Sequence, residues 1–325
     1  MTERAAAGDH AVLVVTQIDD ATADLVIDEL NGRGVPVVRL DPGDFPGAVT
    51  LNVHADDQGL GGTIATDTRC VDVTGVRAVY WRRPRPYASP KAIAGDDARW
   101  VVDQARYGLG GVLAALPGAG YVNHPWRIRD AEHKPAQLAA AARFGLRVPR
   151  TLITNDAAAA QGMAEDHGPV VYKPLWNTPY SSEDGQACSI WVTETSPAEM
   201  DDSVGATAHL FQHRVDKVAD VRLTVVGRRM WAVRIDGSPG LDWRRHYDKL
   251  TYTLIDTPSA VAKAVREYLD TFGLVFGAFD FGLDLDGAWW FYECNPNGQW
   301  AWFPDPIPGQ IAAALADLLQ HPETT

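Results

Sequence analysis

The chain has few of the features that mark secreted or membrane proteins. It contains only three cysteines, Cys70, Cys188 and Cys294, and their wide spacing fits neither a disulfide framework nor a cysteine metal site. No apolar run approaches the roughly 20 residues of a membrane-spanning helix. The N-terminal segment also lacks the basic start of a signal peptide. We therefore expect a cytoplasmic protein without a membrane partner.

Positive charge is also scarce, because 29 Lys and Arg face 42 Asp and Glu, giving a net charge of −13 at pH 7. This balance disfavours a sequence-independent nucleic-acid binder, which must neutralise phosphates, and we expect no nucleic-acid partner. The sequence has no GxxxxGK[ST] phosphate loop and no G-x-S-x-G nucleophile elbow. The GLGG run at 108–111 lies in a helical pattern rather than after a strand, so it is not a dinucleotide fingerprint.

The length of 325 residues, 46% of them apolar, predicts two or three domains with sizeable cores. Strand and helix patterns alternate over the first 120 residues, which indicates a parallel or mixed sheet. A new unit follows, with a helix from Pro135, a helix at 157–167 and a strand at 168–175. From about residue 208 the strands read as antiparallel, and helices are expected at 259–272 and 308–320. We expect units at 1–120, 121–207 and 208–325.

The segment from Phe279 to Trp300 is the most informative, because it reads as a hairpin with an acidic face. Asp286-Gly287 is a favoured pair for a two-residue turn, and this turn places Asp280 opposite Glu293. Asp284 and Asn295 share that face, since strand side chains alternate. The opposite face is expected in the core and carries Phe281, Leu283, Leu285, Trp290, Tyr292 and Cys294. Facing carboxylates repel each other, whereas Mg²⁺ would bind them and keep positions for phosphate oxygens. The hairpin therefore predicts a metal–nucleotide platform.

Two lysines could serve the phosphates of such a nucleotide. Lys173 ends an apolar strand, and the small polar loop at 176–187 suits a lid. Lys134 lies at a helix start, where backbone N–H groups favour an anion. Each lysine alone fits a solvated surface, but together with the acidic face they favour phosphate binding. The strand at 211–215 offers backbone groups to an adenine edge, although it is equally compatible with an ordinary sheet strand.

Arginines form a second group of candidates. Arg82, Arg83 and Arg85 follow an apolar strand, and ligands of open α/β sheets bind beyond the carboxyl ends of strands. Such arginines could hold carboxylates or phosphates, or they could form a solvated basic loop. The remaining candidates lie in the antiparallel unit and are Arg222, Arg234, Arg244 and Arg245.

Taken in order, these segments resemble the ATP-grasp superfamily, and more closely its ribosomal peptide maturases, the graspetide (microviridin-type) synthetases. The resemblance spans nearly the whole chain and is most specific at YWRRP (80–84) and ECNPNGQWAW (293–302). It implies an α/β ATP-grasp fold with an N-terminal Rossmann-like pre-ATP-grasp domain. It also implies ATP, two Mg²⁺ ions for which Mn²⁺ can substitute, and a homodimer.

Carried over by position, the resemblance assigns roles to individual residues. Asp280, Glu293 and Asn295 become Mg²⁺ ligands, and Lys134 and Lys173 become phosphate contacts. Further nucleotide contacts are Gln212, His213, Arg214, Val215 and Lys217, and the expected substrate contacts are Arg82, Arg83, Arg244 and Arg245. The chain lacks the Arg that many ATP-grasp ligases have just before the position of Asp280. Arg222, Arg234 or an arginine of the N-terminal unit is therefore expected to take its place, and Arg222 and Arg234 are the candidates expected to act in catalysis beside Lys173.

The resemblance implies an ATP-dependent ligase that acts on a ribosomal precursor peptide with a leader and a core. An Asp or Glu side chain would be activated as an acyl phosphate and joined to a Thr or Ser hydroxyl or a Lys amine, giving a macrocyclic ester or amide. An ATP-grasp ligase for free amino acids or small peptides is the alternative. A binding module that kept only the fold is a third interpretation, and the retained lysines and metal ligands count against it.

Overall fold

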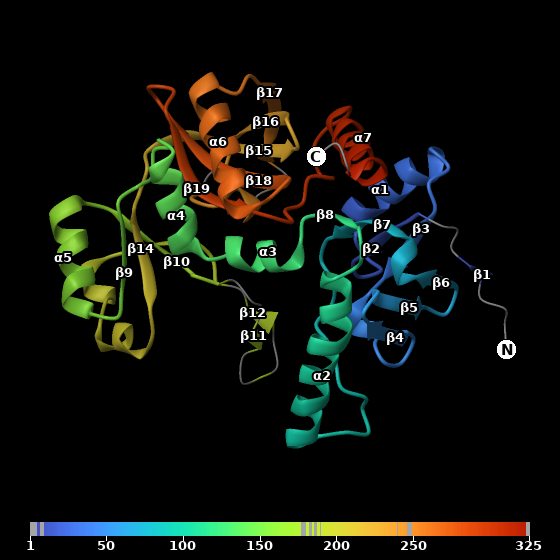
Figure 1. Cartoon of the computed structure of the whole chain (residues 1–325). Coiled ribbons are helices and arrows are strands. Elements are labelled where there is room, and N and C mark those ends of the chain that lie inside the picture. The colour runs from blue at the N-terminus through green and yellow to red at the C-terminus, as the bar shows by residue number, and fades with distance from the viewer. Residues whose placement is uncertain are drawn as a thin grey trace.

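The computed structural model describes residues 5–6, 10–176, 180–181, 184, 187–188, 190–238, 240–245 and 249–322. Its N-terminal part contains a parallel sheet in the order β3-β2-β7-β8 (Figure 1). The strands are β2 (Ala11–Val15), β3 (Val37–Leu40), β7 (Val76–Trp81) and β8 (Gly120–Val122). Every residue of β2 is buried, as expected for the centre of a parallel sheet. Helix α1 (Ala21–Gly32) begins at Asp20, whose carboxylate accepts a hydrogen bond from the N–H of Ala23.

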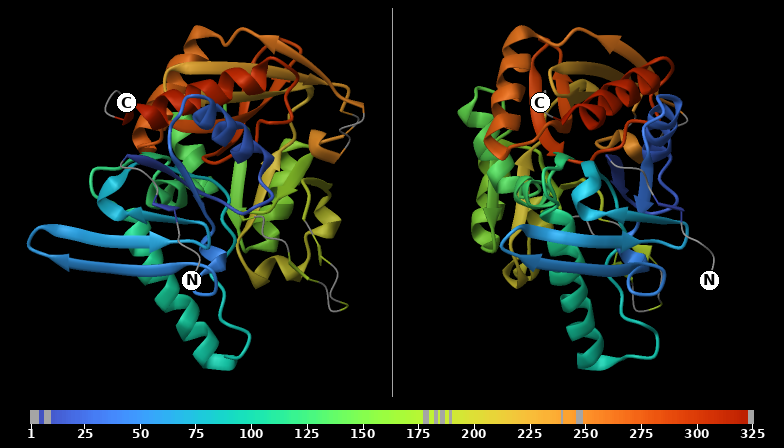
Figure 2. Two further views of the ribbon diagram at one scale, coloured as in Figure 1. Left: turned by 90° about the vertical axis from the view of Figure 1, so that its right-hand side faces the viewer. Right: turned by 45° about the vertical axis from the view of Figure 1, so that its right-hand side comes forward.

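A second sheet in this part has the order β1-β6-β5-β4. Its strands are β1 (Ala5–Ala6), β4 (Thr50–Asp56), β5 (Gly59–Ala65) and β6 (Arg69–Asp72). The β4–β5 hairpin and helix α2 (Gly95–Ala114) project from the body of the molecule (Figure 2).

The middle part begins with two helices, α3 (Pro125–Ala131) and α4 (Lys134–Arg143). An antiparallel sheet follows in the order β13-β10-β14-β9. Its strands are β9 (Thr151–Thr154), β10 (Val170–Lys173), β13 (Thr193–Thr195) and β14 (His209–His213). Helix α5 (Ala157–His167) packs on this sheet through Ala160 and Met163. A short strand pair joins β11 (Tyr180–Ser181) to β12 (Ala187–Cys188), and most of the expected lid at 176–187 lies outside the described residues.

The C-terminal part is built on an antiparallel five-stranded sheet in the order β17-β16-β15-β18-β19. The strands are β15 (Lys217–Val226), β16 (Arg229–Asp236), β17 (Thr251–Ile255), β18 (Phe276–Asp284) and β19 (Trp289–Asn295). Helix α6 (Ser259–Phe272) covers one face, where Tyr268 packs against Phe279 and Phe291. Helix α7 (Ile307–Gln320) returns to the N-terminal part and packs on α1 (Figure 1).

The predicted α/β class is confirmed, and the predicted elements lie close to the observed ones. Helix α3 and strand β17 were not predicted. Helix α3 has only seven residues, three of them charged, so it carries little apolar periodicity. Strand β17 is an edge strand, and much of it is exposed. Among the described residues, no helix combines the length and apolarity needed to cross a bilayer.

The hairpin places Asp280 opposite Glu293, as predicted, but by a different route. Its loop has three residues rather than two, because Asp284 pairs with Ala288 and Gly287 adopts a positive φ of 76°. This loop shifts the register by one, so that Phe281 pairs with Phe291. A bulge at Tyr292 then restores the predicted pair.

The loop and the bulge together explain why part of the predicted core face was wrong. Leu285 lies in the loop and is 86% exposed, and Trp290 and Tyr292 are only partly buried. Trp289 and Phe291 take the core positions instead. A one-residue change of register moves each side chain to the opposite face, which is why the error affected several residues of one strand. Asp284 has turned to the loop, where it accepts hydrogen bonds from the N–H groups of Asp286 and Ala288.

Candidate active site

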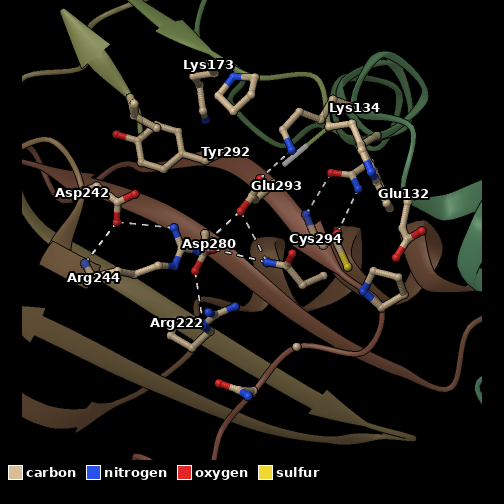
Figure 3. A pocket seen from close by; sticks show the side chains of 18 of the residues that line it. Glu132, Lys134, Lys173, Arg222, Asp242, Arg244, Asp280, Tyr292, Glu293 and Cys294 are labelled. Atoms are coloured by element: carbon tan, nitrogen blue, oxygen red, sulfur yellow. Dashed lines mark hydrogen bonds and ion pairs between the residues drawn. The ribbon is translucent and has the colours of Figure 1, made fainter. Parts of the chain in front are cut away.

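A cavity of about 900 Å³ lies where the three parts of the chain meet. Arg83 lines it from the N-terminal part, Lys134 and Lys173 from the middle part, and Asp280 and Glu293 from the C-terminal sheet. Figure 3 shows the lysines and carboxylates gathered around one space. The fold thus brings together side chains that are far apart in the sequence.

Asp280 and Glu293 form an acidic pair at the floor of this cavity. The Asn295 amide nitrogen lies 3.5 Å from Asp280 Oδ2 and 3.4 Å from Glu293 Oε1. Three cations surround the pair. Lys134 Nζ is 3.1 Å from Glu293 Oε2, Arg222 Nε is 3.3 Å from Asp280 Oδ1, and Arg244 contacts both carboxylates (Figure 3).

These cations decide the charge state of Glu293. Burial alone would raise the pKa of its carboxyl, but the charges of Lys134, Arg244 and Lys173 outweigh burial and hold the pKa well below its usual range. Glu293 is therefore ionised at neutral pH. For the Lys173 ammonium, burial disfavours the charged form and lowers the pKa to about 8, against the attraction of Glu293. Lys173 is thus protonated at neutral pH but loses its charge in mildly alkaline solution.

Lys173 is buried at the end of β10 and is held by two neighbours. Its ammonium lies 3.4 Å from Gln212 Oε1 and 4.9 Å from the centroid of the Tyr292 ring. The Tyr292 phenol fills space that Gly282 leaves open, because a Cβ on Gly282 would lie 2.2 Å from the Tyr292 hydroxyl. Tyr292 is a cavity residue that the sequence analysis missed. The one available signal was a glycine within a strand, which often marks a close approach.

The predicted nucleotide-binding strand overlaps the end of β14 and lines the cavity over Gln212–Val215. Backbone N–H groups of His213 and Arg214 already donate to Arg150 O and Pro169 O, each at 2.8 Å. The Arg214 side chain pairs with Glu194 at 2.9 Å. The contact of this strand with adenine therefore stays a prediction.

Lys217 also lines the cavity, but its ammonium is held by the protein. It lies 2.6 Å from Asp220 Oδ1 and 2.8 Å from the carbonyl oxygen of Leu241. Burial raises the pKa of Asp220 to about 6, although Lys217 opposes the shift. This pair joins β15 to the loop that carries Asp242.

Arg82 and Arg83 are neighbours with different surroundings. Arg82 is 1% exposed and pairs with Asp20 at 3.4 Å, and its guanidinium donates to the carbonyl oxygens of Asn297 and Gly298 at 2.7 and 2.9 Å. Arg83 is exposed and lines the cavity. The structure thus brings Arg83 to the cavity space, whereas the Arg82 guanidinium is engaged with the protein.

The other predicted arginines also differ in whether they lie at the cavity. Arg222 and Arg244 both lie over the ring of Trp243, at 5.7 and 5.1 Å from its centroid, and both reach Asp280. Arg234 instead pairs with Asp236 on β16 and does not line the cavity. Arg245 ends the short 3₁₀ helix Trp243–Arg245, and its side chain is outside the described residues. Trp243 and Asp242, which hold Arg244, carry no sequence signal of this role.

The residues at the floor fit a hard cation. Asp280 and Glu293 supply carboxylate oxygens, and Asn295 supplies an amide oxygen, which are the ligands that Mg²⁺ prefers. Asp280 Oδ1 is buried and accepts no hydrogen bond within the described part of the chain, its contact with Arg222 being an ion pair. No group of three or more His, Cys, Asp or Glu suited to a metal occurs among the residues described. A metal here would depend on Asn295 as the third ligand.

Known proteins share the fold of this chain. The family model of the MvdD pre-ATP grasp domain matches residues 11–129. The macrocyclase MdnC from Microcystis aeruginosa MRC, solved with the precursor peptide MdnA, is 26% identical with a TM-score of 0.85, over 95% of this chain and 99% of that one. The macrocyclase MdnB from the same organism is 25% identical with a TM-score of 0.81, over 95% and 99%. No curated protein matches the sequence.

This chain is an ATP-grasp ligase. The predicted fold, with a pre-ATP-grasp domain at the N-terminus, is confirmed, and so is the resemblance to the ATP-grasp ribosomal peptide maturases. A RiPP-associated ATP-grasp ligase from Chryseobacterium gregarium shares the fold of this ligase at 23% identity, with a TM-score of 0.87 over 95% and 96% of the two chains. The roles of individual residues in this ligase stay predictions.

Proposed function

We propose that this ligase uses ATP to activate a carboxylate side chain of a ribosomal precursor peptide and joins it to a hydroxyl or amine of the same peptide. The observation that carries the proposal is the floor of the cavity, where Asp280 and Glu293 face each other beside Lys134 and Lys173. The similar macrocyclase MdnC was solved with a precursor peptide, and the Chryseobacterium ligase with ADP and a leader and core peptide.

ATP and Mg²⁺ are the proposed cofactors. Asp280, Glu293 and Asn295 would hold two Mg²⁺ ions, for which Mn²⁺ could substitute, and the ions would neutralise charge on the transferring phosphoryl group. Lys134 and Lys173 would contact the phosphates, and the strand at Gln212–Val215 would contact adenine. The fold relative PsnB, 23% identical, was solved with Mg and ADP. Because Arg244 now spans both carboxylates, it must shift when they bind a cation.

The proposed chemistry has two steps. A carboxylate oxygen of an Asp or Glu side chain attacks the γ-phosphorus of ATP, which releases ADP and forms an acyl phosphate. A Thr or Ser hydroxyl, or a Lys amine, then attacks the acyl carbon, the nucleophile loses its proton and phosphate leaves. Arg222 and Arg244 lie near enough to the floor to stabilise the negative charge of both steps. The net change in the peptide is the loss of one water for each ring.

The peptide is the proposed partner of this ligase. A docked leader would raise the effective concentration of the core at the cavity, so that several rings could form on one bound chain. Arg83 is a candidate substrate contact, because its side chain is exposed and lines the cavity. A homodimer, which the family resemblance implies, belongs to the same proposal.

Incubation with ATP, Mg²⁺ and the precursor encoded beside the gene tests the proposal. We expect products lighter by one water mass for each ring, together with ADP and phosphate. Hydroxylamine should trap the acyl phosphate as a hydroxamate. A panel of free amino acids serves as the comparison. ADP release with a free amino acid, and no mass loss on the peptide, would transfer the assignment to the small-substrate alternative.

A further inference from the structure

Strand β19 carries Glu293 and Asn295 but lies at the edge of its sheet, with only β18 beside it. The backbone groups on its outer side therefore need other partners. The N–H of Phe291 donates to the carbonyl oxygen of Arg147 at 2.8 Å. Beyond this point, buried polar side chains from earlier in the chain take the place of the missing strand.

Gln137 of α4 makes the most direct of these contacts. Its side chain is 3% exposed and lies against Cys294, the residue between Glu293 and Asn295. Gln137 Oε1 accepts from the Cys294 N–H at 3.0 Å, and Nε2 donates to the Cys294 carbonyl oxygen at 2.9 Å and to Ala131 O at 2.7 Å. One amide thus holds both backbone groups of Cys294, as a residue of a neighbouring strand would.

Two further side chains hold the residues that follow. The Asn123 amide donates to the carbonyl oxygen of Pro296 at 2.7 Å, and its oxygen accepts from the N–H of Val275 at 2.8 Å. Arg82 donates to the carbonyl oxygens of Asn297 and Gly298. Gln137, Asn123 and Arg82 therefore fix backbone groups of residues 294, 296, 297 and 298, while the side chains of Glu293 and Asn295 line the cavity.

We propose that Gln137 is a positioning residue that aligns Glu293 and Asn295 for cation binding, with Asn123 and Arg82 supporting the loop behind them. This inference rests on the proposed function, because those two side chains are the proposed Mg²⁺ ligands. Ligand atoms must be held to about 0.5 Å for a productive site. Without the Gln137 amide, Cys294 would keep two buried backbone groups without partners, and the end of β19 would move to satisfy them.

The test replaces Gln137 with methionine, which has a similar length but cannot replace these hydrogen bonds. Binding of Mn²⁺ in the presence of ADP is measured by electron paramagnetic resonance of free Mn²⁺, so no peptide turnover is needed. We expect the dissociation constant for Mn²⁺ to rise about 10- to 100-fold, the usual effect of removing a group that orients metal ligands. In the protein without metal or nucleotide, amide hydrogen exchange over residues 293–298 should also become at least about tenfold faster.

Gln161→Met is the matched control. Gln161 Nε2 donates to the carbonyl oxygen of Met200 at 2.8 Å, so the control also loses a side chain–carbonyl hydrogen bond, but on α5 and away from the cavity. It should leave both Mn²⁺ binding and exchange at 293–298 unchanged. If Gln137→Met proves too unstable to study, Arg82→Lys keeps the charge beside Asp20 but cannot span two carbonyl oxygens, and should weaken Mn²⁺ binding about tenfold.

The outcomes separate the two proposals. Weaker Mn²⁺ binding in Gln137→Met but not in Gln161→Met supports the positioning role. Equal binding in wild type and Gln137→Met, or an equal loss in both variants, overturns the positioning role and leaves the proposed function intact. A wild-type protein that binds no Mn²⁺ with ADP overturns the proposed cofactor site, and the positioning role falls with it.

Discussion

Two carboxylates of the cavity, the partly buried Glu293 and the buried Asp220, differ in how their charge is balanced. Glu293 has three cations around it, and their attraction outweighs burial, so its pKa is depressed. Asp220 has one close cation, Lys217, and burial prevails, so its pKa rises to about 6. The number of nearby cations therefore decides the direction of the pKa shift. The pKa is lowered for Glu293, a proposed metal ligand, and raised for Asp220, which joins β15 to a loop.

Glu293→Gln should have the largest effect on activity. The substitution keeps the size of the side chain but removes the charge that we propose for the metal, at a cost of several kcal/mol in the transition state, on the order of a thousandfold in rate. Rates of ADP and ring formation, measured by coupled assay and mass spectrometry, check this. Glu267→Gln, partly exposed on α6 and outside the cavity, is the matched control and should keep full activity. Unchanged ring formation in Glu293→Gln would remove the proposed metal role.

Asp220→Asn should change how stability depends on pH. The Asp220 pKa is raised from 3.8 to about 6 on folding, so the carboxyl stabilises the fold below pH 4, and this contribution is lost as pH rises through 6. At about 1.4 kcal/mol per pH unit, roughly 3 kcal/mol is at stake. Urea unfolding of wild type and variant at pH 4 to 8 measures the difference, which should favour the variant increasingly toward pH 7.

Asp317→Asn is the control of opposite sign. Burial acts to raise the pKa of Asp317, but its hydrogen bonds from Arg33 and Arg229 lower it overall, so its contribution is present above pH 4 and lost as pH falls. Parallel pH profiles for wild type and Asp220→Asn would show that the Asp220 pKa is not raised, and the contrast with Glu293 would disappear.

The charge of Lys173 should make ATP binding depend on pH in mildly alkaline solution. Its pKa of about 8 means that the proposed phosphate contact loses its charge as pH rises through 8. We expect KM for ATP to rise roughly 10-fold or more between pH 7 and 9, the usual weight of a charge-assisted hydrogen bond. In Lys173→Arg the side chain stays charged, so KM should be nearly independent of pH over this range. Wild-type and variant KM values that rise together would assign the titration to another group.

The sequence predicted the acidic pair but not the means by which the fold places it. Asp280 and Glu293 followed from strand alternation and a turn signal, and the two errors in that derivation, a three-residue loop and a bulge at Tyr292, cancelled each other. Leu285 was misplaced because the loop has three residues rather than two, and Tyr292 was misplaced because a bulge leaves no periodic trace in a sequence. Gln137 was missed because its partner, Cys294, lies 157 residues away. Long-range contacts of this kind depend on the packing of whole units, which local patterns do not encode.

Arg234→Ala should have the smallest effect on activity. It tests which of the arginines that the sequence left open acts in catalysis. Arg234 forms a partly exposed pair with Asp236 outside the cavity, and such pairs contribute about 0–1 kcal/mol to stability. We expect kcat to change less than about twofold, with a small fall in the melting temperature. Arg222→Ala is the matched comparison, because Arg222 is buried against Asp280 and is proposed to stabilise the acyl phosphate. Its kcat should fall by about 10²-fold or more. If Arg234→Ala lost as much activity as Arg222→Ala at equal stability, a residue of β16 outside the cavity would take part in catalysis. The catalytic arginines would then not be confined to the cation-rich floor.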